Sequence, residues 1–258
     1  MTAPGHDQNL NLRNSLLITT HSEELALEAR MTSMSSASLL PLAVTAVALY
    51  GLVRLTRARI YDAAIVTLTT GWYAEVLRRL PAGSSFLDVG IGTGLALLNN
   101  AEQLRAKCLT VDGVDYDADY VARCRALVQE QQLAPQVQVH HASVYDFEGG
   151  PYDAVYFSSS LMLMPDAVKA LQHCVAMLKP GTGRVYVTQT IQTSHSRLVE
   201  IGKPLLKFLT SIDFGTVTYE DELLNTFKKA GLTLREHVPI SGSTMTSTRS
   251  FRLFVLEP

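Results

Sequence analysis

Residues 86–94 read FLDVGIGTG, and this stretch decides the fold. A short apolar strand runs into three glycines at alternate positions, and an apolar helical pattern follows from Leu95. Glycine permits a sharp turn and lets a ligand approach the backbone without a Cβ in the way. The helix after the turn offers free N–H groups and the positive end of its dipole. The stretch therefore predicts a ligand-binding loop at the carboxyl end of a strand, where open α/β sheets bind ligands.

The spacing of the glycines distinguishes two kinds of ligand. A dinucleotide-binding loop reads G-x-G-x-x-G, whereas this loop reads G-x-G-x-G, with Asp88 two residues before the first glycine. A second acid, Asp115, follows the strand expected at 109–114. It stands about 20 residues on, where an acid binds ribose hydroxyls. The loop and the acid together predict a ligand with a ribose, and the spacing disfavours a nicotinamide oxidoreductase.

Strands and helices alternate through the rest of the chain. This alternation predicts an α/β fold, a doubly wound parallel sheet with helices on both faces. The last two strands have no helix between them, so one of them should run antiparallel. We expect strands at 85–89, 109–114, 137–141, 154–158, 184–190, 232–239 and 251–256, and helices at 58–80, 95–106, 118–131, 167–178, 194–210 and 220–230.

Composition excludes several classes of protein. The chain has 258 residues, 47% of them hydrophobic, and a net charge of only −2, which argues against overall disorder. The 22 basic residues are balanced by 24 acidic ones, so no general basic field exists for nucleic acid. Three widely spaced cysteines without a CxxC pair support neither a disulfide framework nor a zinc site. We therefore expect reduced thiols, no bound metal and no nucleic-acid partner.

Residues 31–53 carry no charge, and residues 39–53 read LLPLAVTAVALYGLV. A helix rises about 1.5 Å per residue, so this apolar part is shorter than a hydrocarbon core of about 30 Å unless its serine-rich lead-in is included. Two interpretations stand: a helix packed on the protein's own core, or a membrane anchor. Three arginines follow within seven residues, which for an anchor places the rest of the chain on the cytoplasmic side. We divide the chain into an N-terminal segment, 1–57, and a main domain, 58–258. The alternative to membrane association is a soluble cytoplasmic protein.

Taken in order, the motifs of residues 58–258 resemble those of the class I S-adenosylmethionine-dependent methyltransferases. FLDVGIGTG resembles the family's first motif, VDGVDYD its second and HASVYDF its adenine-side motif. YDAVYFSSSLMLMPD resembles the fourth strand with its loop, and LKPGTGRVYV the turn into the fifth strand. The resemblance implies a seven-stranded sheet that ends in an antiparallel strand. It also implies S-adenosylmethionine as the cofactor, with the glycine loop holding its methionine end.

The resemblance also implies which residues contact the cofactor. Many members have an aspartate where this chain has Ser143, on the amino group of adenine; a serine accepts a hydrogen bond without carrying a charge. The backbone of Val144 or the carboxylate of Asp146 could serve adenine instead. The residues expected at the cofactor are Asp88, Gly90, Gly92, Gly94, Asp115, Tyr116, Ser143, Val144 and Ser158.

Methyl transfer from a sulfonium is an in-line displacement, so an enzyme must align the reacting atoms and exclude water. A general base is needed only when the acceptor must lose a proton. His195, after the fifth strand, is the candidate base, with a surface histidine as the alternative. Tyr61 is a second catalytic candidate and shares a helical face with Trp72. We expect Trp72, Tyr73 and Met162 to line the acceptor pocket, with core packing as the alternative, whereas His140 and His141 should be structural.

These expectations converge on methyl transfer to a small, partly apolar molecule such as a lipid, a quinone or a thiol. Two alternatives belong to other classes. The first is methylation of a protein or peptide side chain, which a wide acid-lined groove would favour. The second is a cofactor-binding module without catalysis, which would lack a usable acceptor cavity.

Overall fold

The computed structural model describes residues 41, 44–52, 66–192, 218–240, 246 and 249–258. The chain divides into two compact units, Met1–Arg54 and Leu55–Pro258. The helix expected at 194–210, and the first eight residues of the one expected at 58–80, lie outside the described residues.

In the first unit, residues 44–52 are helical. The hydroxyl of Thr45 donates to the carbonyl of Pro41 at 2.7 Å. Five large apolar side chains of this helix are more than half exposed: Val44, Val47, Leu49, Tyr50 and Leu52. Within the part of the chain that the structure describes, no helix has the length and apolar character needed to cross a membrane.

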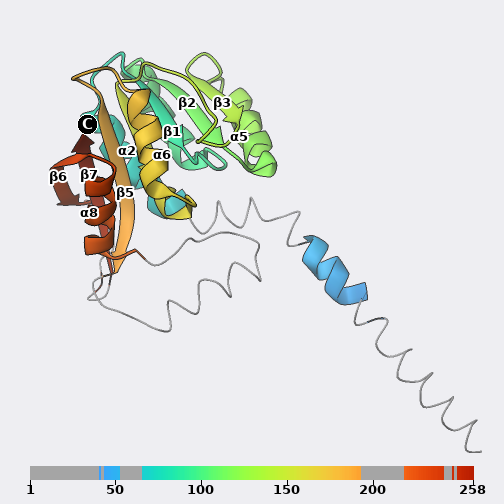
Figure 1. Ribbon diagram of the computed structural model, residues 1–258. Helices are drawn as coiled ribbons and strands as arrows, with labels where there is room; N and C mark the ends of the chain where they lie inside the picture. Colours follow the sequence, from blue (N-terminus) through green and yellow to red (C-terminus); the bar gives the residue numbers. More distant parts are fainter. Residues whose placement is uncertain (1–40, 42–43, 53–65, 193–217, 241–245, 247–248) are drawn as a thin grey trace, which may run out of the picture. The chain divides into compact units, whose positions relative to one another are not determined.

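The second unit is built on one seven-stranded sheet with the order β3-β2-β1-β4-β5-β7-β6 (Figure 1). Strands β1 to β5 pair in parallel, and β7 runs antiparallel to both β5 and β6. The predicted seven-stranded, mostly parallel sheet is therefore confirmed. The strands are β1 (Ser85–Val89), β2 (Thr110–Asp115), β3 (Val137–His141), β4 (Ala154–Ser158), β5 (Arg184–Gln192), β6 (Thr233–Pro239) and β7 (Arg249–Glu257).

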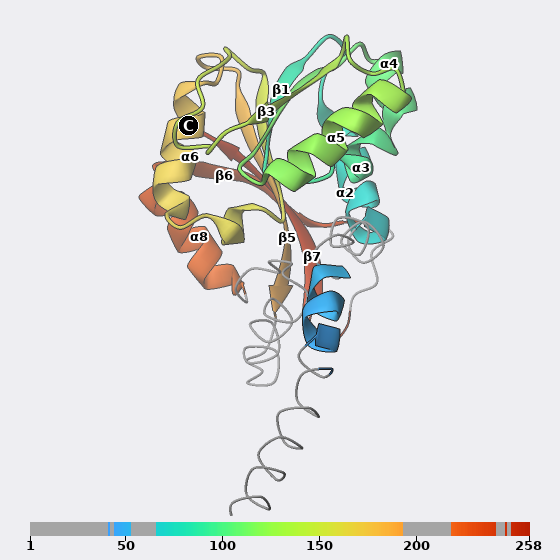
Figure 2. The same cartoon turned by 90° about the vertical axis from the view of Figure 1, so that its right-hand side faces the viewer.

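Helices cover both faces of the sheet, and each face has its own apolar core (Figure 2). Successive side chains of a strand point to opposite faces. Phe86 of β1 and Tyr156 of β4 accordingly lie in one core, and their neighbours Leu87 and Phe157 in the other. The first core is completed by α2 (Thr67–Arg79), α3 (Leu95–Leu98), α4 (Ala101–Ala106) and α5 (Ala118–Glu130), and the second by α6 (Ala167–Ala176) and α8 (Glu220–Lys229).

The prediction of a single helix at 95–106 is wrong. The structure has two helices there, α3 and α4, separated by Asn99 and Asn100. The side-chain amide of Asn100 donates to the carbonyl of Ala96 at 2.9 Å and to that of Thr70 at 3.1 Å. Asparagine side chains compete in this way with the helical hydrogen bonds of the backbone. The break fixes the short helix after the glycine loop to the beginning of α2.

Candidate active site

The glycine loop between β1 and α3 needs glycine for its backbone conformation. Gly90, Gly92 and Gly94 have φ angles of +73°, +60° and +70°, which L side chains rarely adopt. Space is also short: a Cβ on Gly90 would lie 2.7 Å from the Cβ of Ser160, and a Cβ on Gly94 would overlap the sulfur of Cys124. The loop is thus packed closely against Ser160 and Cys124, which leaves no room for a side chain at Gly90 or Gly94.

Asp115, at the end of β2, ties this loop to the neighbouring strand. Its Oδ2 accepts the N–H of Gly92 at 2.9 Å, and its Oδ1 accepts the N–H of Asp117 at 2.9 Å. Burial raises the pKa of Asp115, while these two backbone donors and the N–H of Tyr116 act in the opposite direction. Each carboxylate oxygen has a second lone pair. The oriented carboxylate can therefore accept a further hydrogen bond, as from a hydroxyl of a ribose.

Asp88, on β1, is completely buried. Its Oδ2 accepts a hydrogen bond from the Tyr73 hydroxyl at 2.8 Å, and within the described part of the chain its Oδ1 has no hydrogen-bond partner. Burial raises the pKa of Asp88 to about 7; the Tyr73 hydroxyl opposes this shift, and the nearby charge of Asp115 adds to it. Buried polar atoms in proteins are nearly always paired, so the Oδ1 atom indicates a donor from a ligand.

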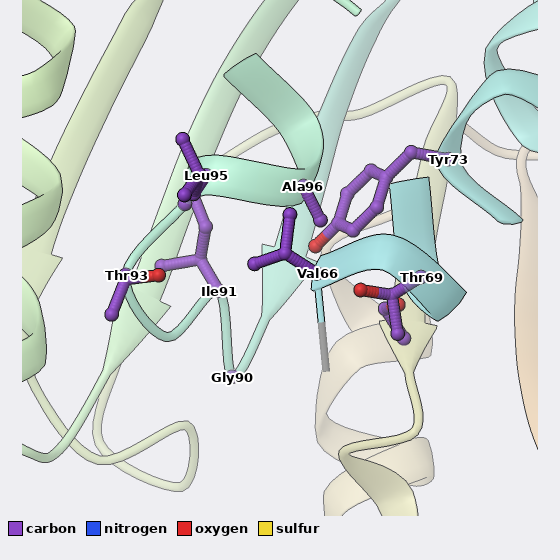
Figure 3. A pocket seen from close by; sticks show the side chains of 10 residues that line it. Val66, Thr69, Tyr73, Gly90, Ile91, Thr93, Leu95 and Ala96 are labelled. Carbon is purple, nitrogen blue, oxygen red and sulfur yellow. The ribbon is translucent and has the colours of Figure 1, made fainter. Parts of the chain in front are cut away.

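A pocket lies between the first turns of α2 and the glycine loop (Figure 3). It brings together four predicted site residues, since Tyr73, Gly90, Gly94 and Ser158 all line it. The sequence analysis missed two buried threonines, Thr69 and Thr93. Thr69 stands one helical turn before Tyr73, and that spacing would have found it. The remaining described residues of the lining are Val66, Ile91, Leu95 and Ala96.

The expected adenine side lies next to this pocket along the sheet edge. β2 and β3 pair so that Asp115 stands opposite His141, and Ser143 follows two residues later. The Ser143 hydroxyl accepts the N–H of Tyr145 at 3.3 Å. Val144 is buried, whereas Tyr116 is 71% exposed beside Asp115. Tyr116, Ser143 and Val144 thus follow the carboxyl ends of two adjacent strands.

The acceptor-side candidates are scattered. Trp72 is 1% exposed, packs against Phe251 with ring centroids 5.6 Å apart, and is not among the described residues that line the pocket. Met162 lies in the 3-10 helix η2 (Leu161–Leu163), with its sulfur 3.0 Å from the amide nitrogen of Gln189. Tyr61 and His195 lie outside the described residues.

Two expectations about histidine and metal can also be placed. His140 pairs with Asp112 at 2.6 Å, in keeping with a structural role. No group of His, Cys, Asp or Glu side chains that could hold a metal ion occurs among the residues the structure describes.

Comparison with known proteins places these residues in a family context. Residues 86–181 match the methyltransferase domain family. The chain is 26% identical over 153 residues to a phosphatidylethanolamine N-methyltransferase of Cereibacter sphaeroides, with 56% of this chain and 72% of the relative covered. It is 31% identical over 165 residues to a ubiquinone biosynthesis O-methyltransferase of Xanthomonas axonopodis pv. citri (strain 306), with 60% and 65% covered.

The chain thus spans just under two thirds of the length of the second relative. Among solved structures, a SAM-dependent methyltransferase from Aquifex aeolicus has the same fold, with a TM-score of 0.59 at 17% identity. That likeness covers 78% of this chain and 97% of the other.

Proposed function

The chain belongs to the class I S-adenosylmethionine-dependent methyltransferases, and on that premise we propose that it transfers a methyl group to a small, partly apolar molecule such as a lipid, a quinone or a thiol. The observation that carries the cofactor assignment is the pair of contacts at Asp115. One carboxylate holds the middle of the glycine loop through the N–H of Gly92 and the start of α5 through the N–H of Asp117. The position of the Asp115 carboxylate relative to the glycine loop is therefore fixed. A ligand that has a ribose next to an amino-acid tail requires such a fixed arrangement.

The residues present fit S-adenosylmethionine. The left-handed loop depends on glycine, because a Cβ on Gly90 or Gly94 would meet Ser160 or Cys124. Asp88 offers a buried carboxylate oxygen without a partner, and a cationic ammonium is the group that satisfies such an oxygen. We assign Asp88, Gly90, Gly92 and Gly94 to the methionine end and Asp115 with Tyr116 to the ribose. Ser143, Val144 and Ser158 complete the cofactor set on the adenine and sulfonium sides.

The bound cofactor supplies an electrophilic methyl group on its sulfonium. The chain's own contribution is to orient the acceptor in line with that group and to exclude water. Tyr73 and Ser158 line the pocket from α2 and β4, and the apolar side chains of Val66 and Ile91 limit the access of water. We propose His195 as the general base and Tyr61 as a second catalytic residue on sequence grounds. Replacing His195 with Ala should then lower turnover about 10²–10⁴-fold. A loss below about threefold would show that His195 is not a general base.

The acceptor class is supported by the names of the relatives. One is an enzyme for phosphatidylethanolamine and the other for ubiquinone biosynthesis, and both names refer to molecules with a large apolar part. We propose Met162 as a residue of the acceptor side, whereas Trp72 packs in the core against Phe251. Methylation of a protein side chain and cofactor binding without catalysis remain the alternatives.

The experiment for the acceptor class uses methyl-labelled S-adenosylmethionine and the full-length chain. Acceptors from three classes are offered: vesicles with phosphatidylethanolamine, catechol-type quinone precursors, and alkyl or aryl thiols. The Asp115→Ala variant is the control for the cofactor site. The proposal is supported if the methyl label appears in the organic phase with the wild type and not with the Asp115→Ala variant. Label only on a peptide library would favour the first alternative, and binding of cofactor with no label in any fraction would favour the second.

We also propose membrane association through residues 39–53, with the methyltransferase domain on the cytoplasmic side. Five exposed apolar side chains on the helix at 44–52 support it. Flotation with lipid vesicles tests it: the full chain should float, and a Leu49→Asp/Leu52→Asp variant should stay at the bottom. A wild type that stays at the bottom would contradict membrane association.

A further inference from the structure

Tyr73 and Asp88 form a buried pair between α2 and β1. The Tyr73 hydroxyl donates to Oδ2 of Asp88 at 2.8 Å, and both side chains are almost fully buried. The second oxygen of the carboxylate, Oδ1, has no hydrogen-bond partner among the described residues. An unpaired buried carboxylate oxygen costs free energy in the unliganded protein. The pair is therefore half satisfied, with one oxygen fixed by the chain and the other left for a ligand.

The hydroxyl of Tyr73 is held in place before any ligand binds. Its ring stands edge-on to the ring of Tyr156, with centroids 5.0 Å apart and an interplanar angle of 85°. The hydroxyl of Tyr156 is in turn hydrogen-bonded to that of Thr188 at 2.8 Å. Figure 3 shows the ring of Tyr73 pointing from α2 toward the glycine loop. Because α2, β4 and β5 together fix this ring, the donor to Asp88 is preorganised.

The charge of Asp88 depends on its surroundings. Among the described residues, three titratable groups face it: Tyr73 from α2, Asp115 from β2 and Tyr156 from β4. None of them is a cation. Burial raises the pKa of Asp88 to about 7 and the Asp115 charge acts in the same direction, while the Tyr73 hydroxyl favours the charged form. Near neutral pH, the hydroxyl thus shifts the protonation equilibrium of Asp88 toward the charged form.

We infer that Tyr73 is a positioning residue for the cofactor: its hydroxyl fixes Oδ2 of Asp88, which leaves Oδ1 to bind the ammonium of the cofactor's methionine end. The inference rests on the proposed function, in which that end lies at the glycine loop. It gives Tyr73 a role on the cofactor rather than on the acceptor. It also predicts that cofactor affinity depends on pH through Asp88.

The test is the dissociation constant of S-adenosylhomocysteine, measured by calorimetry from about pH 6 to 8.5 on the full-length chain. This product keeps the ammonium and lacks the sulfonium. For the wild type, affinity should fall about tenfold per pH unit below a midpoint near 7, because only the charged carboxylate binds the cation. In Tyr73→Phe the midpoint should rise by about 1 pH unit, the scale of one hydrogen bond to a charged group. The variant should then bind about fivefold more weakly at pH 7 and recover at high pH.

The matched control is Tyr156→Phe, which removes a buried hydroxyl that is bonded to Thr188 and not to Asp88. It should leave the midpoint where it is in the wild type. A loss of affinity in Tyr73→Phe that is equal at every pH, or no loss at all, would overturn the inference, because a merely structural role would not move the midpoint.

The Asp88→Asn variant provides a second, independent test if Tyr73→Phe does not fold. Its affinity should be low and independent of pH over the same range, and a wild-type pH dependence in this variant would also overturn the inference. The two failures are distinguishable. If the wild type does not bind S-adenosylhomocysteine at any pH, the proposed function fails; if it binds and the midpoint does not respond to Tyr73, only the role of Tyr73 fails.

Discussion

The backbone N–H of Gly92 donates to Oδ2 of Asp115 at 2.9 Å, so the middle glycine of the loop and the acid at the end of the next strand form one unit. The contact joins β1 and β2 at the edge where open α/β sheets bind ligands. It orients the carboxylate and fixes the loop at the same time. A ligand that uses both finds them already in place, which lowers the entropic cost of binding.

Replacing Asp115 with Ala should weaken S-adenosylhomocysteine binding by about 1.5–3 kcal/mol, since hydrogen bonds to a charged group are lost. Calorimetry measures the change. The control is Asp117→Ala: the carboxylate of Asp117 caps α5 by accepting the N–H groups of Asp119 and Tyr120, so this variant should lose about 1 kcal/mol of stability and no affinity. Equal affinities of Asp115→Ala and the wild type would remove Asp115 from the ribose site.

Gly90→Ala should destabilise the protein more than Gly181→Ala. Both glycines have nearly the same left-handed φ, +73° and +74°, but a Cβ on Gly90 meets Ser160 while a Cβ on Gly181 meets nothing within 4 Å. The conformational cost of about 1–2 kcal/mol is common to both, and only Gly90→Ala adds a steric one. Urea denaturation gives the two free energies of unfolding. Similar values for both variants would show that the loop has room to adjust.

The stability of the unliganded protein should depend on the charge of Asp88. Its folded pKa, about 7, is above the ordinary value of about 3.9. The folded state therefore holds the proton over that interval, and this stabilisation is fully present below about pH 4 and is lost as the pH rises through about 7. Relative to Asp88→Asn, the free energy of unfolding of the wild type should fall by up to about 4 kcal/mol between these limits. A constant difference from pH 5 to 8 would show that the Asp88 pKa is not raised.

Trp72→Ala should cost about 3–5 kcal/mol of stability, the usual range for removal of a large buried aromatic side chain. Trp72 is 1% exposed and packs against Phe251 of β7. Trp72→Phe retains most of this packing and should lose much less. Thermal denaturation measures both. If Trp72→Ala keeps its stability and loses only turnover, Trp72 contacts the acceptor rather than the core.

The parts of the fold that depend on local pattern could be predicted from the sequence. The alternation of apolar strands and amphipathic helices gave the sheet, and the missing helix before the last strand gave its antiparallel end. The break between α3 and α4 could not be predicted, because it depends on Asn100 reaching the carbonyl of Thr70, a residue 30 positions away. Long-range contacts of single polar side chains leave no periodic signal in the sequence.

The same distinction applies to the site. The glycine loop and Asp115 are marked by spacing, because a backbone approach needs glycine and a ribose needs an acid at a strand end. The pairing of Tyr73 with Asp88 joins a helix to a strand 15 residues away and is set by tertiary packing. The sequence therefore predicts both Tyr73 and Asp88 at the site, but not the hydrogen bond between them. Trp72 illustrates the opposite case, since a large aromatic residue on the same helix could face the core or a ligand.

One titration tests the central claim most directly: calorimetry of the full-length chain at about pH 8 with S-adenosylmethionine, S-adenosylhomocysteine and NAD, each against the wild type and Gly92→Val. At Gly92 the backbone has φ +60°, which a branched side chain resists. The account predicts that the wild type binds both sulfur compounds and not NAD, and that Gly92→Val binds none of the three. Binding of NAD by the wild type, or undiminished binding of S-adenosylhomocysteine by Gly92→Val, would contradict it.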